Sequence, residues 1–276
     1  MPEPNRSPQP ATSRVPLSRR LLRRIKSRAL QPESTYRLYL KLKFGTDRPA
    51  ARPNLPLPNS ALKTRAEWQQ ALEAAKAERL PLHRGEEKNW DHLAAVFAIL
   101  GSTTTSARVL DAGAEFYSNV LPTLFAYGYH NLYGINLSFT EEARRGPIRY
   151  LPGDITRTIF ADGYFDTVAC MSVIEHGVPL EGYFREMYRV LKPGGLLITS
   201  TDYYPTAIDT EGKMAHGAAI KIFTRTEIQE ILRLAQAVGF ESTGEVDLEC
   251  GERPVRWAQF GLDYSFVIFT LRKPMA

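Results

Sequence analysis

Short apolar segments end in polar residues at several points between residues 108 and 202 of this chain. The polar residue types are carboxylates, an amide, a serine and a histidine, all of which bind polar ligands. In chain order the polar residues are Asp111, Asn136, Asp154, Ser172, Glu175, His176 and Asp202. Gly113 follows Asp111 in the first of these turns, and Ile155 follows Asp154. Because the carboxyl ends of parallel strands share one edge of a sheet, the order predicts a ligand site at that edge.

Two histidines are the candidates for proton transfer. His176 follows the fourth apolar segment, and histidine titrates near neutral pH, so it is the first candidate for a general base. His216 lies in the long connection 205–222, which we interpret as a substrate lid, and it is the second candidate. His176 could equally be a structural residue that orients its loop, and the connection could be an ordered surface loop. Glu175 is expected to contact backbone amides or a cofactor rather than to titrate.

Strand and helix patterns alternate along the part of the chain that carries these residues. Strand-like apolar segments lie at 108–112, 131–136, 165–170, 196–200, 245–250 and 264–271. Helical periodicity predicts helices over 61–80, 87–100, 119–127, 180–191 and 224–237. The last helix begins with a capping box, Thr224 and Glu227, and Gly239 is its expected stop. The alternation predicts the α/β fold class.

The segment from about Arg108 to Lys273 resembles a class I S-adenosylmethionine-dependent methyltransferase. Asp111 and Gly113 begin the family's acidic-x-Gly-x-Gly motif, and Asn136 stands where the family has an acid at the end of its second strand. Further matches are Asp154, the phrase from Phe165 to His176, and the Lys-Pro-Gly-Gly turn at 192–195. The resemblance implies a Rossmann-like doubly wound seven-stranded sheet, mostly parallel, with one antiparallel strand near the C-terminus.

The same resemblance implies an enzyme that uses S-adenosylmethionine as its cofactor. The residues that it assigns to the cofactor are Asp111, Gly113, Glu115, Asn136, Asp154, Ile155, Ser172 and Glu175. Asp202, Tyr203 and Tyr204 follow the fifth strand and are expected to bind the acceptor. Lys88 and Trp90 precede the first strand and could face the site, although packing against the sheet is the commoner role for such a tryptophan. The expected reaction moves a methyl group to an oxygen or nitrogen of a small-molecule acceptor, either carbohydrate-like or lipid-linked.

Two departures from the family pattern leave an alternative open. Glu115 and Tyr117 occupy positions where the family has small residues, and Asn136 cannot form the charge-assisted bond that an acid makes with a ribose. The chain could therefore be a catalytically silent relative that acts as a binding or scaffold protein. A nicotinamide-dependent oxidoreductase of the same fold would need Gly-x-Gly-x-x-Gly after the first strand, and the residues from Gly113 to Ser118 do not supply it.

Composition sets further bounds on the chain. Its 276 residues are 43% hydrophobic and 24% charged, as in an ordinary globular protein. The cysteines, Cys170 and Cys250, lie in apolar segments and indicate a reducing compartment, hence a cytoplasmic location. No His/Cys cluster has zinc spacing, and Asp202, Asp209 and Glu211 are expected to be solvated, so we expect no metal.

The first 60 residues carry most of the positive charge. They form a Pro-rich arm with 13 Lys and Arg against 3 Asp and Glu. Within it, residues 17–30 have the pattern of a basic amphipathic helix, which predicts peripheral contact with the inner face of a membrane, or else a solvated helix. The predicted organisation is therefore an arm over 1–60, a helical cap over 61–106 and a methyltransferase domain over 107–276. The remainder of the chain is net acidic, which argues against nucleic acid as the acceptor, and the oligomeric state stays open.

Overall fold

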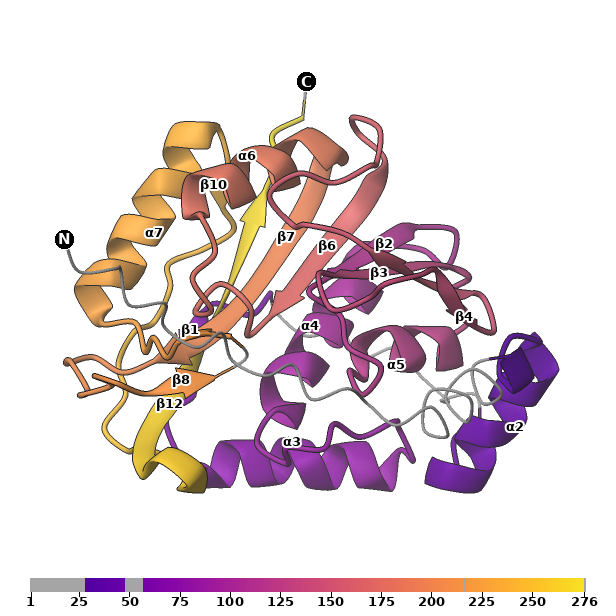
Figure 1. The fold of residues 1–276 in the computed structure, drawn as a ribbon, viewed down its shortest axis with the longest axis horizontal. Coiled ribbons are helices and arrows are strands. Elements are labelled where there is room, and N and C mark those ends of the chain that lie inside the picture. Colours follow the sequence, from indigo (N-terminus) through magenta and orange to yellow (C-terminus); the bar gives the residue numbers. More distant parts are fainter. Residues whose placement is uncertain (1–27, 48–56, 216, 276) are drawn as a thin grey trace, which may run out of the picture.

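Five parallel strands form the centre of a mixed sheet in the computed structural model, which describes residues 28–47, 57–215 and 217–275 (Figure 1). The strands are β2 (Arg108–Ala112), β3 (Asn131–Asn136), β5 (Ile148–Pro152), β6 (Phe165–Met171) and β7 (Leu191–Tyr203). They are arranged in the order β7-β6-β2-β3-β5. From β2 the chain first adds β3 and β5 on one side of the sheet, and then adds β6 and β7 on the other side. Ligands bind at this kind of switch point in open α/β folds. The predicted α/β class and parallel centre are confirmed.

The sheet is extended by antiparallel strands at both sides. The short strand β4 (Ala143–Arg145) pairs with β5, and the long strand β12 (Leu262–Arg272) lies beside β7. Three short strands pair antiparallel with β12: β1 (Ser60–Ala61), β10 (Glu241–Ser242) and β11 (Val255–Trp257). Within the described ranges the sheet therefore has ten strands, and the expected number of seven was wrong.

The predicted strand over 245–250 is absent among the described residues. Asp247 alone makes a bridge, to Ser60, and its backbone exchanges hydrogen bonds with Asn59 and Ala61 at 3.0 and 2.7 Å. The β1 segment, which precedes the first helix of the cap, thus lies between β12 and Asp247. The alternating acids of 245–249 face ion partners at the surface, including Lys63 and Arg225.

Helices cover both faces of the sheet (Figure 1). On one face α6 (Leu180–Val190) and α7 (Arg225–Val238) pack on a core that includes Phe184 and Phe269. On the other face α4 (Asn89–Ser102) and α5 (Val120–Ala126) pack on a core that includes Ile99 and Phe125. The capping box of Thr224 and Glu227 is present at the start of α7, and its stop is the left-handed glycine that the sequence predicted.

The remaining elements lie outside these layers or in the long connection after β7. The helix α3 (Arg65–Ala77) packs against α4, and α2 (Glu33–Phe44) lies beside α5, where the rings of Tyr36 and Phe125 stack 5.5 Å apart. The connection holds a small hairpin of β8 (Met214–Ala215) and β9 (Ala218–Ala219), and the turn η1 (Ala258–Phe260) precedes β12.

Some of the expected features lie outside the described residues. They include His216 and residues 17–27 of the predicted amphipathic helix. The described part of the chain holds no helix long and apolar enough to cross a membrane.

Candidate active site

The turn after β2 is built around a glycine that no other residue could replace without strain. Gly113 has a φ of 95°, in the left-handed region, and its backbone N–H donates to Ile135 O at 2.8 Å. A Cβ at this position would overlap the methyl groups of Val173, which follows β6. The turn after β2 and the loop after β6 are therefore in direct contact at the carboxyl edge of the sheet.

Polar side chains beside this turn are held by local hydrogen bonds. The Asn136 amide donates to Gly113 O at 3.0 Å, and its Oδ1 accepts from the backbone N–H of Ser138 at 2.8 Å. The Ser138 hydroxyl donates to Glu115 Oε1 at 3.0 Å. A carboxylate thus lies near the end of β3 although the strand itself ends in an amide. The sequence analysis assigned Glu115 to the cofactor and also noted it as a departure from the family's glycine, but it did not predict that this carboxylate would lie at the end of β3.

The two aromatic residues of this loop pack away from each other. The ring of Phe116 lies 4.9 Å from that of Phe139, and the ring of Tyr117 lies 5.4 Å from that of His83 in the cap. The Arg84 guanidinium lies 5.5 Å from the Tyr117 ring centroid. Tyr117, which stands where the family has a small residue, therefore contacts the cap, and Phe116 contacts Tyr150 of β5, although both rings are partly exposed.

Asp154 and Ile155 follow β5 at the same edge. The exposed Asp154 accepts hydrogen bonds at Oδ1 from the backbone N–H and hydroxyl of Thr156, at 2.8 and 2.7 Å. Ile155 is buried against the sheet. This arrangement leaves the carboxylate at the surface of the edge, in a turn that holds its direction.

The ends of β6 and β7 carry a cluster of buried polar groups. Ser172 has a φ of 53°, which is rare for a residue other than glycine, and its N–H donates to Ser200 O at 3.0 Å. Glu175 is 1% exposed and accepts from the Thr201 hydroxyl at 2.9 Å. Asp91, on α4, is fully buried and accepts from the Ser200 hydroxyl at 2.6 Å. The ends of both strands therefore bind carboxylates that come from other elements.

Lys88, at the residue before α4, is the cation of this cluster. Its ammonium donates to the Ser172 hydroxyl and lies 3.5 Å from Asp202 Oδ1. It also lies 3.4 Å from the centroid of the Phe266 ring. Phe266 is the cross-strand partner of Asp202 between β12 and β7, so both side chains lie on the same face of the sheet. Lys88 thus lies at the edge where the site is expected, whereas Trp90 is half-buried in apolar packing.

Burial and like charge shift the carboxyl groups of this edge toward the neutral form. Burial raises the pKa of Asp202 to about 7, with a contribution from the Glu175 charge, while Lys88 and His176 oppose the rise. Burial also raises the pKa of Glu175 and that of Asp91. Burial alone raises the pKa of Asp111 to about 7. Carboxyls that titrate near neutral pH are suited to exchange protons with a ligand.

The remaining residues expected in the site lie in different surroundings. His176 is half-buried beside Asp202, whose pKa its charge lowers. Tyr203 is fully buried, and its hydroxyl donates to Leu248 O at 2.6 Å, so its side chain belongs to the core. Tyr204 is half-buried, with the Arg253 guanidinium 4.4 Å from its ring centroid.

Sequence reasoning missed Asp91 and Phe266. The charge of Asp91 within an otherwise apolar helix was a usable signal, because an acid in such a position needs a buried partner. Nothing in the sequence of β12 distinguished Phe266 from its apolar neighbours. No group of three or more potential metal ligands occurs among the residues that the structure describes.

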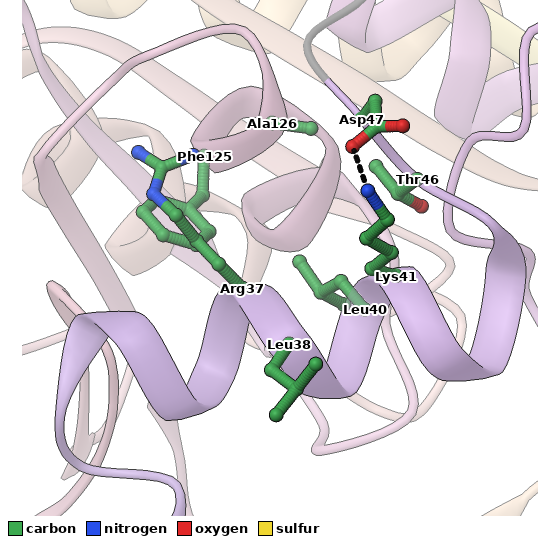
Figure 2. A pocket seen from close by; sticks show the side chains of 8 residues that line it. All are labelled: Arg37, Leu38, Leu40, Lys41, Thr46, Asp47, Phe125 and Ala126. Carbon is green, nitrogen blue, oxygen red and sulfur yellow. Dashed lines mark hydrogen bonds and ion pairs between the residues drawn. The ribbon is translucent and has the colours of Figure 1, made fainter.

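Two cavities of the described part of the chain lie away from this edge. One, of about 340 Å³, lies between α2 and α5. Figure 2 shows Arg37 over the ring of Phe125 and the ion pair of Lys41 with Asp47, 3.1 Å apart, along its wall. The other, of about 620 Å³, is lined by Asp166 and by other residues at the opposite end of the strands.

The chain is similar to known methyltransferases. A family model described as a methyltransferase domain matches residues 110–199. The sterol 24-C-methyltransferase of Debaryomyces hansenii is 30% identical over 119 residues, covering 40% of this chain and 31% of that protein. The sterol 24-C-methyltransferase of Neurospora crassa is 30% identical over 118 residues, covering 41% and 31%. The match thus spans about a third of the length of these relatives.

A solved structure with a related fold is that of the [4+2]-cyclase SpnF. It has a TM-score of 0.50 and 16% identity, and it covers 79% of this chain and all of its own. Its likeness concerns the fold alone. The domain match over residues 110–199 supports the resemblance to class I S-adenosylmethionine-dependent methyltransferases, and the strand order and the glycine turn after β2 agree with it. The matched residues run from β2 into β7, so they include Gly113, Asn136, Asp154 and Glu175.

Proposed function

We propose that this protein transfers a methyl group from S-adenosylmethionine to an oxygen or nitrogen of a small-molecule acceptor. The observation that carries the proposal is the contact between Gly113 and Val173. It joins the glycine turn after β2 to the loop that bears Ser172 and Glu175. A ligand on the turn would therefore lie next to buried groups that can exchange protons.

The residues on β2, β3 and β5 fit the polar parts of the cofactor. We call Gly113, Glu115, Asn136 and Asp154 the cofactor half of the edge. The positive φ of Gly113 lets backbone come close to a ligand. Glu115 supplies a half-buried carboxylate for ribose hydroxyls, since the Asn136 amide is already bonded to the backbone at both ends. Asp154 offers an exposed carboxylate for the adenine amino group.

The residues on β6 and β7 suit the transfer step. The cofactor, when bound, supplies a methyl group on an electrophilic sulfonium. Ser172, Glu175 and Asp202 provide hydrogen-bonding groups that are largely shielded from water, which favours alignment of the acceptor and limits side reactions. Asp202 and His176 are placed to hold the proton that the acceptor loses. His216, which lies outside the described residues, stays a second candidate for the same role.

The identity of the acceptor is the finer part of the proposal. The relatives are named as sterol methyltransferases, which supports an acceptor with an apolar body, free or lipid-linked. Half-buried aromatic residues after β7 and before β12 would suit such a body; they are Tyr204, Trp257 and Phe260. Polar groups at 201–204 would equally suit a carbohydrate. The solved cyclase of the same fold is a reminder that the fold does not set the reaction.

A second candidate function is a binding or scaffold protein without turnover. Two observations favour it: the Lys88 ammonium already donates to the Ser172 hydroxyl, and both the nitrogen and the oxygen of the Asn136 amide are bonded to the backbone. Binding without turnover would keep the cofactor half and use the edge for recognition only.

Calorimetry with S-adenosylmethionine and S-adenosylhomocysteine tests both candidates. The enzyme proposal expects both to bind, followed by slow release of S-adenosylhomocysteine when acceptors are supplied. No heat of binding up to millimolar concentrations would overturn the enzyme proposal. Binding without turnover across alcohols, amines and sugars would leave the silent relative as the better description.

For the arm, we infer peripheral contact with an anionic membrane surface from the cytoplasmic side, on the basis of its charge. Deleting residues 1–27 tests this without disturbing the fold, because Tyr36 and Leu40 of α2 are buried against the domain. Loss of binding to vesicles that contain anionic lipid is the expected result. Unchanged binding would contradict it.

A further inference from the structure

The ammonium group of Lys88 is enclosed by a hydroxyl, a carboxylate and an aromatic ring. The Ser172 hydroxyl accepts a hydrogen bond from it, Asp202 Oδ1 lies 3.5 Å away, and the Phe266 ring centroid lies 3.4 Å away. A hydroxyl acceptor, a carboxylate and an aromatic face are the groups that recognise a desolvated organic cation. The lysine side chain is 16% exposed and the Asp202 side chain 6%, so the cation is largely removed from water.

The enclosure carries more acid than Lys88 can balance. Glu175 and Asp91 are also buried, and both interact electrostatically with the same ammonium. Glu175 Oε1 is buried without a hydrogen-bond partner among the described residues. Three carboxyl groups thus surround one internal cation, and one carboxylate oxygen is left for a group that the chain itself does not provide.

We infer that this enclosure, which we call the ammonium cage (Ser172, Glu175, Asp202 and Phe266), binds the ammonium group of the methyl acceptor. The acceptor class would then be a primary or secondary aliphatic amine, and Lys88 would occupy the cage until that amine replaces it. The inference rests on the proposed function and selects nitrogen over oxygen within it. Lys88 is a suitable internal substitute because its side chain ends in a primary alkylammonium group on a flexible stem.

The position of the cage in the sheet favours the acceptor over the cofactor as its ligand. Its residues belong to β7, β12 and the loop after β6, whereas Gly113, Asn136 and Asp154 follow β2, β3 and β5. In the strand order β12-β7-β6-β2-β3-β5 the two sets lie on opposite sides of the boundary between β6 and β2. The contact of Gly113 with Val173 is where they meet, which is the place at which a methyl group would pass from one to the other.

The transfer step balances with the groups present. The acceptor enters as an ammonium ion and gives one proton to the Asp202 carboxylate, or to Glu175 beside it. The neutral nitrogen then attacks the methyl carbon, so that a C–N bond forms as the C–S bond breaks and its electron pair stays on sulfur. The products are a methylated ammonium ion and the neutral thioether S-adenosylhomocysteine. The positive charge lost at sulfur appears on nitrogen, within the cage.

The test empties the cage and supplies its ligand from solution. In Lys88→Ala, n-butylammonium should bind about tenfold or more tightly than n-butanol, because only the cation makes charge-assisted and cation–π interactions with the cage. It should also bind more tightly to this variant than to the unchanged protein, in which Lys88 occupies the cage. Binding is measured by calorimetry on the full chain in the presence of S-adenosylhomocysteine. Lys76→Ala, which removes an exposed lysine paired with Glu73, is the matched control and should not gain amine binding.

The outcomes separate this inference from the proposed function. If S-adenosylhomocysteine binds but Lys88→Ala shows no preference for butylammonium over butanol, the amine inference is overturned and methyl transfer to another acceptor survives. If S-adenosylhomocysteine does not bind, the proposed function itself fails. If Lys88→Ala does not fold, the rates of methyl transfer by the unchanged protein are compared instead. We expect n-butylamine to be methylated faster than n-butanol, as measured by mass spectrometry. A faster reaction with the alcohol would overturn the inference.

Discussion

The cofactor half of the edge and the ammonium cage are built in different ways. In the cofactor half, hydrogen bonds hold exposed or half-buried polar groups, either within a turn, as in Asp154 with Thr156, or between neighbouring strand ends, as in Asn136 with Gly113. In and around the cage, bonds and ion pairs join distant segments, as in Asp91 with Ser200 and Lys88 with Asp202. Asp154 is exposed, whereas Asp202 is almost completely buried.

This difference has a chemical consequence. Local turns present polar groups to a ligand in a direction that the turn itself holds, and their charges stay hydrated. A buried cluster, by contrast, changes the acidity of its members, and burial raises the pKa of Asp202 to about 7. The first arrangement suits binding of a polar cofactor, and the second suits exchange of a proton. Each of the following predictions would break or sharpen that contrast.

The largest effect is expected on turnover in Asp202→Asn. Removing a group that accepts the proton of the acceptor should lower the rate by about 10²- to 10⁴-fold. Binding of S-adenosylhomocysteine should be unchanged, because Asp202 lies outside the cofactor half. Release of S-adenosylhomocysteine and calorimetry measure the two quantities. The exposed Asp209, changed to Asn, is the matched control, and a rate in Asp202→Asn equal to that of the control would contradict the role.

The next effect is on stability in Asp111→Asn. Burial raises the folded pKa of Asp111 to about 7, from an ordinary value of 3.8. The folded state therefore holds a proton that the unfolded state releases between these values, so the wild-type protein loses stability as pH rises through that window. Replacing the acid by a neutral amide should raise the free energy of unfolding at pH 8 by on the order of 4 kcal/mol.

The pH dependence is the check on that prediction. Below about pH 4 the carboxyl is protonated in both states, so Asp111→Asn and the wild type should have similar stability there. Denaturant unfolding at pH 4 and pH 8 measures both values. A gain at pH 8 that persists unchanged at pH 4 would show that packing, and not the buried charge, is responsible.

A smaller effect is expected for Gly113→Ala. The positive φ costs about 1–2 kcal/mol for an L-residue, and overlap with Val173 adds about 1–3 kcal/mol. Gly212→Ala is the matched control, because Gly212 has a φ of 70° and no atom lies within 4 Å of the place that an added methyl group would take. The control should therefore lose only the backbone contribution. Thermal unfolding measures the stability of both variants. An equal loss of stability at both positions would mean that Val173 moves to accommodate the added methyl group at little cost.

The smallest effect is expected for Asp154→Asn. Asparagine keeps the turn with Thr156, and only the charge is lost, so binding of S-adenosylmethionine should weaken about tenfold, the worth of one charge-assisted hydrogen bond. Asp162→Asn, at an exposed carboxylate that pairs with Arg189, is the control. Unchanged affinity in Asp154→Asn would remove this residue from the cofactor half.

The parts of the site predicted from sequence are those made by short segments. The order of strands and polar residues located β2, β3, β6 and β7, the polar residues that follow β5, and the edge on which these strands end, because apolar periodicity and turn residues are local signals. The stop of α7 at Gly239 and its capping box were likewise readable. The strand over 245–250 was mistaken, because a strand pattern does not say which partner will be present. Here β1, which is far away in sequence, lies between β12 and Asp247.

The sequence by itself therefore determined the fold class, the resemblance to methyltransferases and the position of the glycine turn. Only the tertiary structure decided which charges meet at the site: it brought Lys88, Asp202 and Phe266 together and buried Glu175 beside them. It also brought Glu115 to the end of β3. The physical reason is that turns and strands follow from neighbouring residues, whereas burial, ion pairing and the resulting acidity depend on groups that only long-range packing makes neighbours.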